Sequence, residues 1–170
     1  WSSIAIARAY PLVTVDGFDL DTAAIADAVR NAAAERLADR VSFSVADAAA
    51  AELSGRYDLV TILAGFHDMA RPVDVLRAVR AMLADGGSVV MIDEKVADEF
   101  TAPAPELERY HYGWSVVTCL PSAMGDPRTA ATGAVMRTAT LRRYAEEAGF
   151  HSVEVLPIEH DVFRFYRIVP

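Results

Sequence analysis

LVTVDGFDLD, residues Leu12 to Asp21, is a short apolar and β-branched run that ends in a cluster of acids. Such a run predicts a buried strand over Leu12–Asp19. Within it, Gly17 leaves room for the close approach of a ligand or another backbone. Asp19 lies near the carboxyl end of the strand, where α/β sheets bind ligands, and its two carboxylate oxygens can accept both hydroxyls of a ribose. Asp21 is the expected N-cap of the helix that follows.

The composition bounds the kind of protein and its partners. The chain has 170 residues, of which 53% are hydrophobic and 24% charged, so it can fold as one globular domain with a core. The net charge of −8 would repel a phosphate backbone, and we therefore expect no nucleic-acid partner. Cys119 is the only cysteine, which excludes an internal disulfide and favours the cytoplasm. No apolar run approaches the ~20 residues that span a bilayer, so we expect no membrane partner.

Strands and helices alternate at the spacing of βα units, which predicts a parallel sheet with helices on both faces. Tyr57–Ala64 is nearly all apolar, as is typical of a strand covered on both faces. The link near Pro157 to Asp161 is too short for a parallel crossover and predicts an antiparallel hairpin. The predicted strands are Leu12–Asp19, Val41–Val45, Tyr57–Ala64, Ser88–Asp93, Val153–Leu156 and Phe163–Val169; the predicted helices are Ser2–Tyr10, Thr22–Leu37, Pro72–Ala84, Glu106–Leu120 and Thr138–Ala148.

Local signals define several helix boundaries and faces. Gly86–Gly87 is expected to end the third helix, and Gly149 to close the last one in the left-handed conformation. A short alanine-rich turn or helix is expected to lead to Ser54–Gly55. The second helix should direct one stripe of residues toward a sheet: Ile25, Ala28, Val29, Ala32 and Ala33.

Residues 96–137 interrupt the βα rhythm and carry many of the aromatic side chains. A long insertion at the carboxyl edge of a sheet often forms a lid or a substrate pocket. Within the helix predicted there, Tyr110 and Trp114 are four residues apart and should share one face. We therefore predict a substrate lid over 96–137, with Pro121–Gly133 as a loop.

Five segments, taken together and in this order, resemble the class I S-adenosylmethionine-dependent methyltransferases: GFDLD after a strand, VADA, RYDLVTILAGFHDM, ADGGSVVMID, and EEAGF before a closing hairpin. The resemblance covers nearly all of residues 1–170. It implies a three-layer, Rossmann-like α/β sandwich of seven strands, mostly parallel with an antiparallel last strand, and S-adenosylmethionine as cofactor. The family's first strand and glycine-rich loop would precede Trp1, so we expect a methyltransferase catalytic domain that continues upstream.

The same resemblance implies roles for individual residues. Asp19, with Leu20 beside it, matches the acid that binds the cofactor ribose. Asp47 and Ala48, in VADA, match the positions beside adenine. Ala64 and Gly65 match the loop along the methionine end. More narrowly, FHDM, YHYGWS and FRFYRIVP resemble actinobacterial small-molecule methyltransferases, which often form dimers through an N-terminal winged-helix domain.

Three side chains are candidates for proton transfer to or from a substrate: His67, His111 and Tyr110. His67 follows the third strand, and a neutral imidazole can accept a proton near pH 7. A loop histidine held by hydrogen bonds is the alternative, and positioning and desolvation alone can suffice for methyl transfer. Phe66, Tyr110 and Trp114 are the candidates for contact with a flat substrate, with core packing as the alternative.

We expect no metal site. Asp68, Asp93 and Glu94 are hard ligands that suit magnesium, but the pattern of metal-dependent members is not visible here. Neither His151 nor His160 has a pairing that indicates zinc. Two other classes of function stay open. An NAD-type oxidoreductase also places an acid at the end of a strand for ribose, and a non-catalytic ligand-binding module could keep the same fold.

Overall fold

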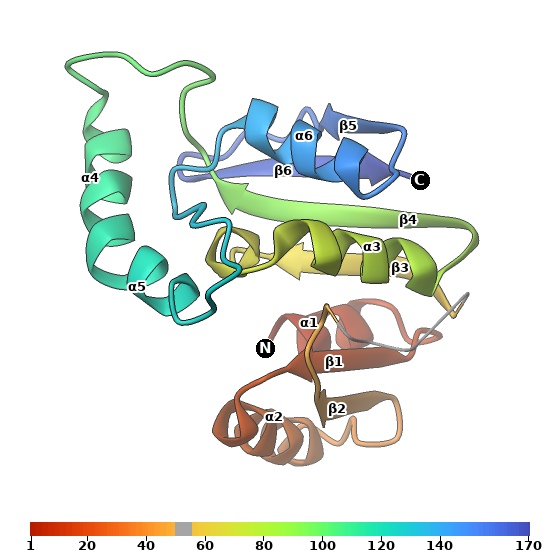
Figure 1. The fold of residues 1–170 in the computed structure, drawn as a ribbon. Helices are drawn as coiled ribbons and strands as arrows, with labels where there is room; N and C mark the ends of the chain where they lie inside the picture. The colour runs from red at the N-terminus through yellow and green to blue at the C-terminus, as the bar shows by residue number, and fades with distance from the viewer. Residues whose placement is uncertain (50–55) are drawn as a thin grey trace. The chain divides into compact units, whose positions relative to one another are not determined.

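A computed structural model describes residues 1–49 and 56–170. The chain divides into two compact units, Trp1–Ala51 and Glu52–Pro170, which we call the N-unit and the C-unit and describe separately (Figure 1). The expected alanine-rich turn or helix before Ser54–Gly55 lies outside the described residues. Among those that are described, no helix combines the length and the apolar character needed to cross a membrane.

The N-unit pairs two parallel strands with two helices. Its elements are α1 (Ser2–Ala9), β1 (Val15–Asp19), α2 (Thr22–Ala34) and β2 (Val41–Val45). β1 and β2 run parallel, with Val15 opposite Val41 and Asp19 opposite Val45. Its core is a small apolar cluster of Ile4, Ala7, Ala32, Leu37 and Val41, against which Val15 and Phe43 pack. The Asp21 carboxylate accepts hydrogen bonds from the amides of Ala23 and Ala24, which confirms the predicted N-cap.

Two boundaries in the N-unit differ from the prediction. β1 begins at Val15 because Val15 is the first residue with a partner on β2, and Leu12 is 99% exposed. α2 ends at Ala34 because Arg36 adopts a left-handed conformation with φ 58°. The amides of Arg36 and Leu37 then bond to the carbonyls of Ala33 and Ala32, which is a Schellman ending made without glycine.

Contacts inside the N-unit also correct the expected helix stripe and the role of Gly17. Ile25 and Ala32 are buried, as predicted, but Val29 is about half exposed and Ala33 is exposed. The space beside Gly17 is taken by a side chain of the same unit, because a Cβ atom there would lie 2.5 Å from the Phe43 ring.

The C-unit holds a four-stranded sheet in the order β3-β4-β6-β5 (Figure 1). Its strands are β3 (Tyr57–Leu63), β4 (Leu83–Glu94), β5 (Ser152–Val155) and β6 (Phe163–Val169). Its helices are α3 (Pro72–Met82), α4 (Glu106–Trp114), α5 (Leu120–Ala123) and α6 (Thr138–Glu147), with a 3₁₀ turn η1 (Phe66–Asp68) and a π-helical turn η2 (Ser115–Cys119).

Strand directions in the C-unit agree with the prediction. β3 and β4 are parallel, whereas β6 runs antiparallel to both β4 and β5, so the closing hairpin and the antiparallel last strand are confirmed. α3 and α6 lie side by side over the sheet (Figure 1). α6 ends as predicted at Gly149, which has φ 89°. The mixed α/β class is confirmed, but the described strands number six, in two separate sheets, where the resemblance implied one sheet of seven.

The prediction that Tyr57–Ala64 is covered on both faces is wrong, because β3 exposes Leu59 and Leu63, whereas in β4 every second residue from Gly87 to Asp93 is buried. Within the C-unit sheet, β3 pairs with β4, and its Leu59 is half exposed. β4 also starts earlier than expected, at Leu83, where the backbone becomes extended directly after α3. Gly87 is therefore inside the strand, and a Cβ atom there would lie 2.8 Å from the Tyr57 carbonyl oxygen.

The segment 96–137 is more helical than predicted. α4, η2 and α5 run without a break from Glu106 to Ala123, so the first residues of the predicted loop Pro121–Gly133 belong to a helix. Pro121 lies inside this run, two residues after the π-helical turn ends. The π turn η2 lies between α4 and α5, and its Ser115 and Cys119 are buried.

Candidate functional site

A buried histidine–aspartate pair lies where β3 and β4 end. His67 is in η1, just after β3, and Asp93 is near the end of β4. His67 Nδ1 and Asp93 Oδ1 are 2.6 Å apart, and the two side chains are only 4% and 1% exposed. Burial alone would lower the pKa of His67, but the Asp93 carboxylate and nearby acids outweigh it, so the pKa is raised. The pair has the geometry of a histidine oriented by a carboxylate.

The turn that carries His67 is sharply bent. Ala64 follows β3 in a left-handed conformation with φ 53°, while its amide still bonds to the Ile92 carbonyl. A non-glycine residue in this region costs free energy, and such residues concentrate at functional loops. The bend ends the β3 ladder and brings Phe66 and His67 back toward the sheet, where both are buried.

A second histidine faces the next acid of β4. His111, on α4, is buried, and its Nε2 lies 3.6 Å from Glu94 Oε2. Neither atom has a hydrogen-bond partner among the described residues. Burial raises the pKa of Glu94, and the nearby His111 only partly opposes this effect. The prediction had treated His111 as a possible base; the structure adds that it faces a carboxyl group.

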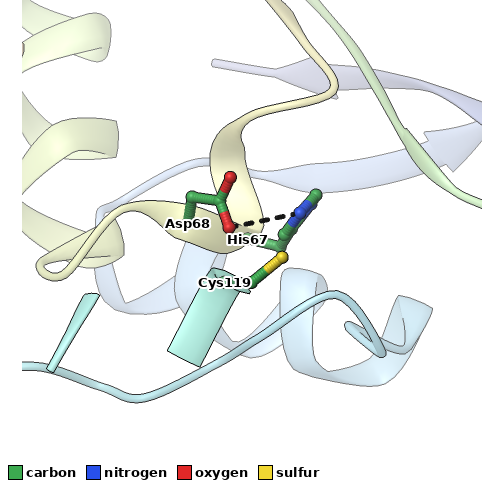
Figure 2. A group of neighbouring side chains, drawn as sticks. All are labelled: His67, Asp68 and Cys119. Carbon is green, nitrogen blue, oxygen red and sulfur yellow. Dashed lines mark ion pairs between the residues drawn. The ribbon is translucent and has the colours of Figure 1, made fainter. Parts of the chain in front are cut away.

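Cys119 and Asp68 complete this polar cluster of the C-unit (Figure 2). His67 Nε2 lies 3.4 Å from Asp68 Oδ1, on the side of the ring opposite Asp93. Cys119, the last residue of η2, is buried with its thiol beside the same carboxylate. Burial and the neighbouring Asp68 raise the pKa of Cys119 to about 12, so the free thiol stays protonated.

A charged clasp joins both ends of the segment 96–137. Glu108, on α4, is buried and accepts hydrogen bonds from Arg137 at 2.6 Å and from the Ala97 amide at 3.0 Å. Arg137 also donates to the Ala97 carbonyl and to the Tyr112 hydroxyl. These bonds hold α4 against the residues where the segment leaves and rejoins the sheet.

The predicted aromatic residues separate into two groups. Tyr110 and Trp114 are exposed and stacked, with ring centroids 6.2 Å apart, which confirms that they share one face of α4. Phe66 is fully buried and meets Tyr144 edge to face, which favours the packing alternative for this residue. Its contact with substrate stays a prediction.

The residues matched to the cofactor lie at strand ends in both units. In the N-unit, Asp19 ends β1, is exposed, and accepts a hydrogen bond from the Asp21 amide at 2.9 Å with one oxygen. Leu20 beside it is exposed, and Asp47 accepts from the Ala49 amide at 2.8 Å, next to Ala48. In the C-unit, Ala64 and Gly65 form the bend after β3. The structure places each residue without testing its role.

The sequence analysis named His67, His111 and the acids of this cluster, but it did not predict which of these side chains contact one another. It named Asp93 and Glu94 only as possible magnesium ligands, at a site that it did not expect. Because β3 and β4 are neighbouring parallel strands, their carboxyl ends meet at one edge, and this rule could have paired Asp93 with His67. No signal in the sequence marks Cys119, because its position depends on the π turn.

Comparison with known proteins identifies the family. A family profile described as a methyltransferase domain matches residues 2–89, a little over half of the chain. The chain therefore belongs to the methyltransferase domain family, and the predicted family is confirmed. No curated protein matches the sequence.

Solved structures of O-methyltransferases share the fold. An O-methyltransferase family protein from Burkholderia thailandensis is 19% identical, with a TM-score of 0.71 over 98% of this chain and 46% of that one. Mitomycin 7-O-methyltransferase is 18% identical, with a TM-score of 0.69 over 97% and 44%. The neocarzinostatin O-methyltransferase, solved with S-adenosylhomocysteine and 1,4-dihydroxy-2-naphthoic acid, is 21% identical, with a TM-score of 0.68 over 97% and 44%. The chain thus spans just under half the length of these structures.

Proposed function

We propose that the protein transfers a methyl group from S-adenosylmethionine to an oxygen, nitrogen or carbon atom of a small molecule. The observation that carries this proposal is the buried His67–Asp93 pair at the carboxyl ends of β3 and β4, in a chain of the methyltransferase domain family. S-adenosylmethionine supplies an electrophilic methyl group on a sulfonium, and the protein must present to it a lone pair of the acceptor.

His67 is the proposed general base for a hydroxyl acceptor. In the proposed tautomer, the Nδ1–H group of His67 donates a hydrogen bond to Asp93. The lone pair on Nε2 is then free to take the proton of the acceptor. The same carboxylate stabilises the imidazolium that this transfer creates. His111, which lies beside Glu94, and Tyr110, which is exposed on α4, are the further candidates for the base.

The cofactor residues in this proposal are those of the resemblance. An exposed carboxylate at the end of a parallel strand fits a ribose, so Asp19 and Leu20 are assigned to the ribose and Asp47 and Ala48 to adenine. The bend at Ala64 and Gly65 is assigned to the methionine end. The neocarzinostatin enzyme was solved with S-adenosylhomocysteine, and this supports the assignment of the cofactor.

The substrate side is assigned to the segment 96–137. The stacked Tyr110 and Trp114 offer an exposed aromatic surface to a flat molecule, and Phe66, packed against Tyr144, is the further candidate for contact with it. The bicyclic aromatic acid bound by the neocarzinostatin enzyme supports a flat substrate. The clasp of Glu108 and Arg137 anchors the segment at both of its ends, as a lid requires.

Three features of the whole protein belong to the same proposal. The related structures are about twice as long as this chain, which supports a larger polypeptide whose catalytic domain includes these 170 residues and continues upstream of them. A homodimer formed through an N-terminal region is proposed from the narrower resemblance. The free thiol of Cys119 supports a reducing, cytoplasmic location.

Calorimetric titration with S-adenosylhomocysteine and with NAD tests the cofactor. We expect binding of the first alone. The variant Asp19→Ala should lose affinity by about 1–3 kcal/mol, because hydrogen bonds to the ribose are removed. Asp39→Ala, another exposed acid of the N-unit, is the matched control and should bind normally. Binding of NAD instead would establish the oxidoreductase alternative, and binding of neither would favour a non-catalytic module.

Release of S-adenosylhomocysteine during incubation with S-adenosylmethionine and hydroxylated aromatic acids tests the base. For an acceptor that is turned over, His67→Asn should lower kcat about 10²–10⁴-fold with little change in cofactor affinity. His151→Gln, which alters an exposed histidine before β5, is the control. Full activity of a folded His67→Asn variant would remove His67 from the chemistry.

A further inference from the structure

Three potential metal ligands converge in the C-unit (Figure 2). A ring nitrogen of His67, a carboxylate oxygen of Asp68 and the Cys119 sulfur all lie within 4.8 Å of one another, and His67 Nε2 is 3.4 Å from Asp68 Oδ1. Two come from the turn after β3 and the third from the last residue of η2. A tetrahedral zinc ion holds such ligands at about 2.0–2.3 Å, which places them roughly 3.5 Å apart. The observed separations need only small side-chain shifts to reach this geometry.

The other nitrogen of His67 is already positioned as in a metal site. Histidine ligands usually donate their second ring N–H to a carboxylate, which orients the ring and raises the basicity of the ligating nitrogen. Asp93 occupies this place, 2.6 Å from Nδ1. The lone pair of His67 therefore lies on Nε2, which faces Asp68.

The local charge also favours a cation. One oxygen each of Asp68, Asp93 and Glu94 is buried without a hydrogen-bond partner among the described residues. The ion pairs recorded for these three carboxylates are with His67 and His111, which are charged only when protonated. Burial of carboxylate oxygens without compensation is costly, and a divalent cation would offset that cost.

We propose that His67, Asp68 and Cys119 form a three-ligand site for Zn²⁺, with a fourth position open to water. The thiolate sulfur selects a borderline-soft ion over Mg²⁺ or Ca²⁺. The Cys119 S–H bond breaks as the S–Zn bond forms, and its proton passes to the buffer. The Asp68 side chain is 43% exposed, so the ion reaches the site from solvent.

The site has a consequence that rests on the proposed function. A zinc ion on Nε2 of His67 occupies the lone pair that would accept the substrate's proton. Metal binding and base catalysis then exclude each other, and zinc acts as an inhibitor that leaves cofactor binding intact.

Titration of the metal-free protein with Zn²⁺, and absorption spectra with Co²⁺ in its place, test the site. We expect one Zn²⁺ per chain, no displacement by excess Mg²⁺, and a thiolate-to-cobalt charge-transfer band. Asp68→Asn should weaken Zn²⁺ binding at least about tenfold, and Asp93→Asn about 10–100-fold through the orientation of His67. Cys119→Ser should abolish the charge-transfer band.

Controls separate this site from adventitious binding and from the proposed function. His151→Gln and His160→Gln remove exposed histidines and should bind Zn²⁺ as the unaltered protein does. Asp68 is partly exposed, so its variant should fold, and circular dichroism checks this. Equal affinity of Asp68→Asn and the unaltered protein, or a Co²⁺ spectrum without the thiolate band, would overturn the site. Titration with S-adenosylhomocysteine reports on the proposed function separately, because it involves none of these three ligands.

Discussion

The N-unit and the C-unit use the same alternation of strands and helices, yet they bury their apolar residues differently. In the C-unit, β4 has a strand on each side, and Val89 and Met91 are fully buried. In the N-unit, β1 and β2 pair only with each other among the described strands, and Leu12 and Val45 are exposed. An apolar segment thus becomes core only when neighbours cover it. A two-stranded sheet supplies few of them.

The largest expected difference is in hydrogen exchange. Amides of β4 are held by ladders on both sides, whereas those of β1 are held by one. In native conditions we expect β1 amides to exchange at least roughly 100-fold faster than those of β4, because local opening of a small unit is easier than global unfolding. Mass spectrometry of peptides from the two strands measures this. Equal protection of the two strands would mean that the two units open together, and it would contradict the expected lower stability of the N-unit.

A matched pair of leucine variants measures burial directly. Leu76, on α3 of the C-unit, is 0% exposed, and Leu76→Ala should lower the free energy of unfolding by about 2–5 kcal/mol. Leu12→Ala removes the same atoms from a side chain that is 99% exposed, and it should change the free energy of unfolding by less than about 0.5 kcal/mol. Urea denaturation followed by circular dichroism compares them. A large loss for Leu12→Ala would show that the N-unit uses this residue in its stability.

The buried charge of the C-unit can be compared with an exposed ion pair of the N-unit. Glu108→Gln weakens the hydrogen bonds to Arg137 and should lower the free energy of unfolding by about 1.5–3 kcal/mol. Glu35→Gln disrupts the surface ion pair with Arg8 and should lower it by at most about 1 kcal/mol. Burial alone would raise the pKa of Glu108, but hydrogen bonds from Arg137 and the Ala97 amide outweigh it, so this pKa is lowered.

The sign of the pH effect follows from that direction. A group whose folded pKa is lowered contributes its full stability above the unfolded pKa, about 4.3, and loses it as the pH falls through the folded pKa. The difference in unfolding free energy between the protein and Glu108→Gln should therefore be constant at neutral pH and shrink in acid. A difference independent of pH below 4 would exclude an ionic contribution of Glu108.

The smallest effect concerns the two Schellman helix ends. Gly149 closes α6 with φ 89°, a conformation that strains alanine. Gly149→Ala should therefore lower the free energy of unfolding by about 1 kcal/mol. Arg36 closes α2 with φ 58° and carries the strain already, so Arg36→Gly should be neutral or stabilising by up to about 1 kcal/mol. Thermal unfolding should move the two melting temperatures in opposite directions or leave Arg36→Gly unchanged. A clear loss for Arg36→Gly would assign the arginine side chain a contact of its own.

Much of the fold was predictable because its signals are local. Asp21 caps α2 with its own side chain, Pro72 opens α3, Gly149 permits the left-handed turn, and the short link before β6 allows only an antiparallel return. The helix end at Arg36 was not predictable, because no residue preference marks arginine for a left-handed conformation.

The candidate site divides in the same way. The sequence alone determined that His67 follows a strand and that Tyr110 and Trp114 share a helix face, because chain order and helical periodicity place them. Only the tertiary structure decided that β4 has a strand on each side, that Asp93 holds His67, and that Cys119, at the end of η2, lies beside Asp68. Strand order, strand register and a π-helical turn are set by packing between distant segments, and local sequence carries little record of them.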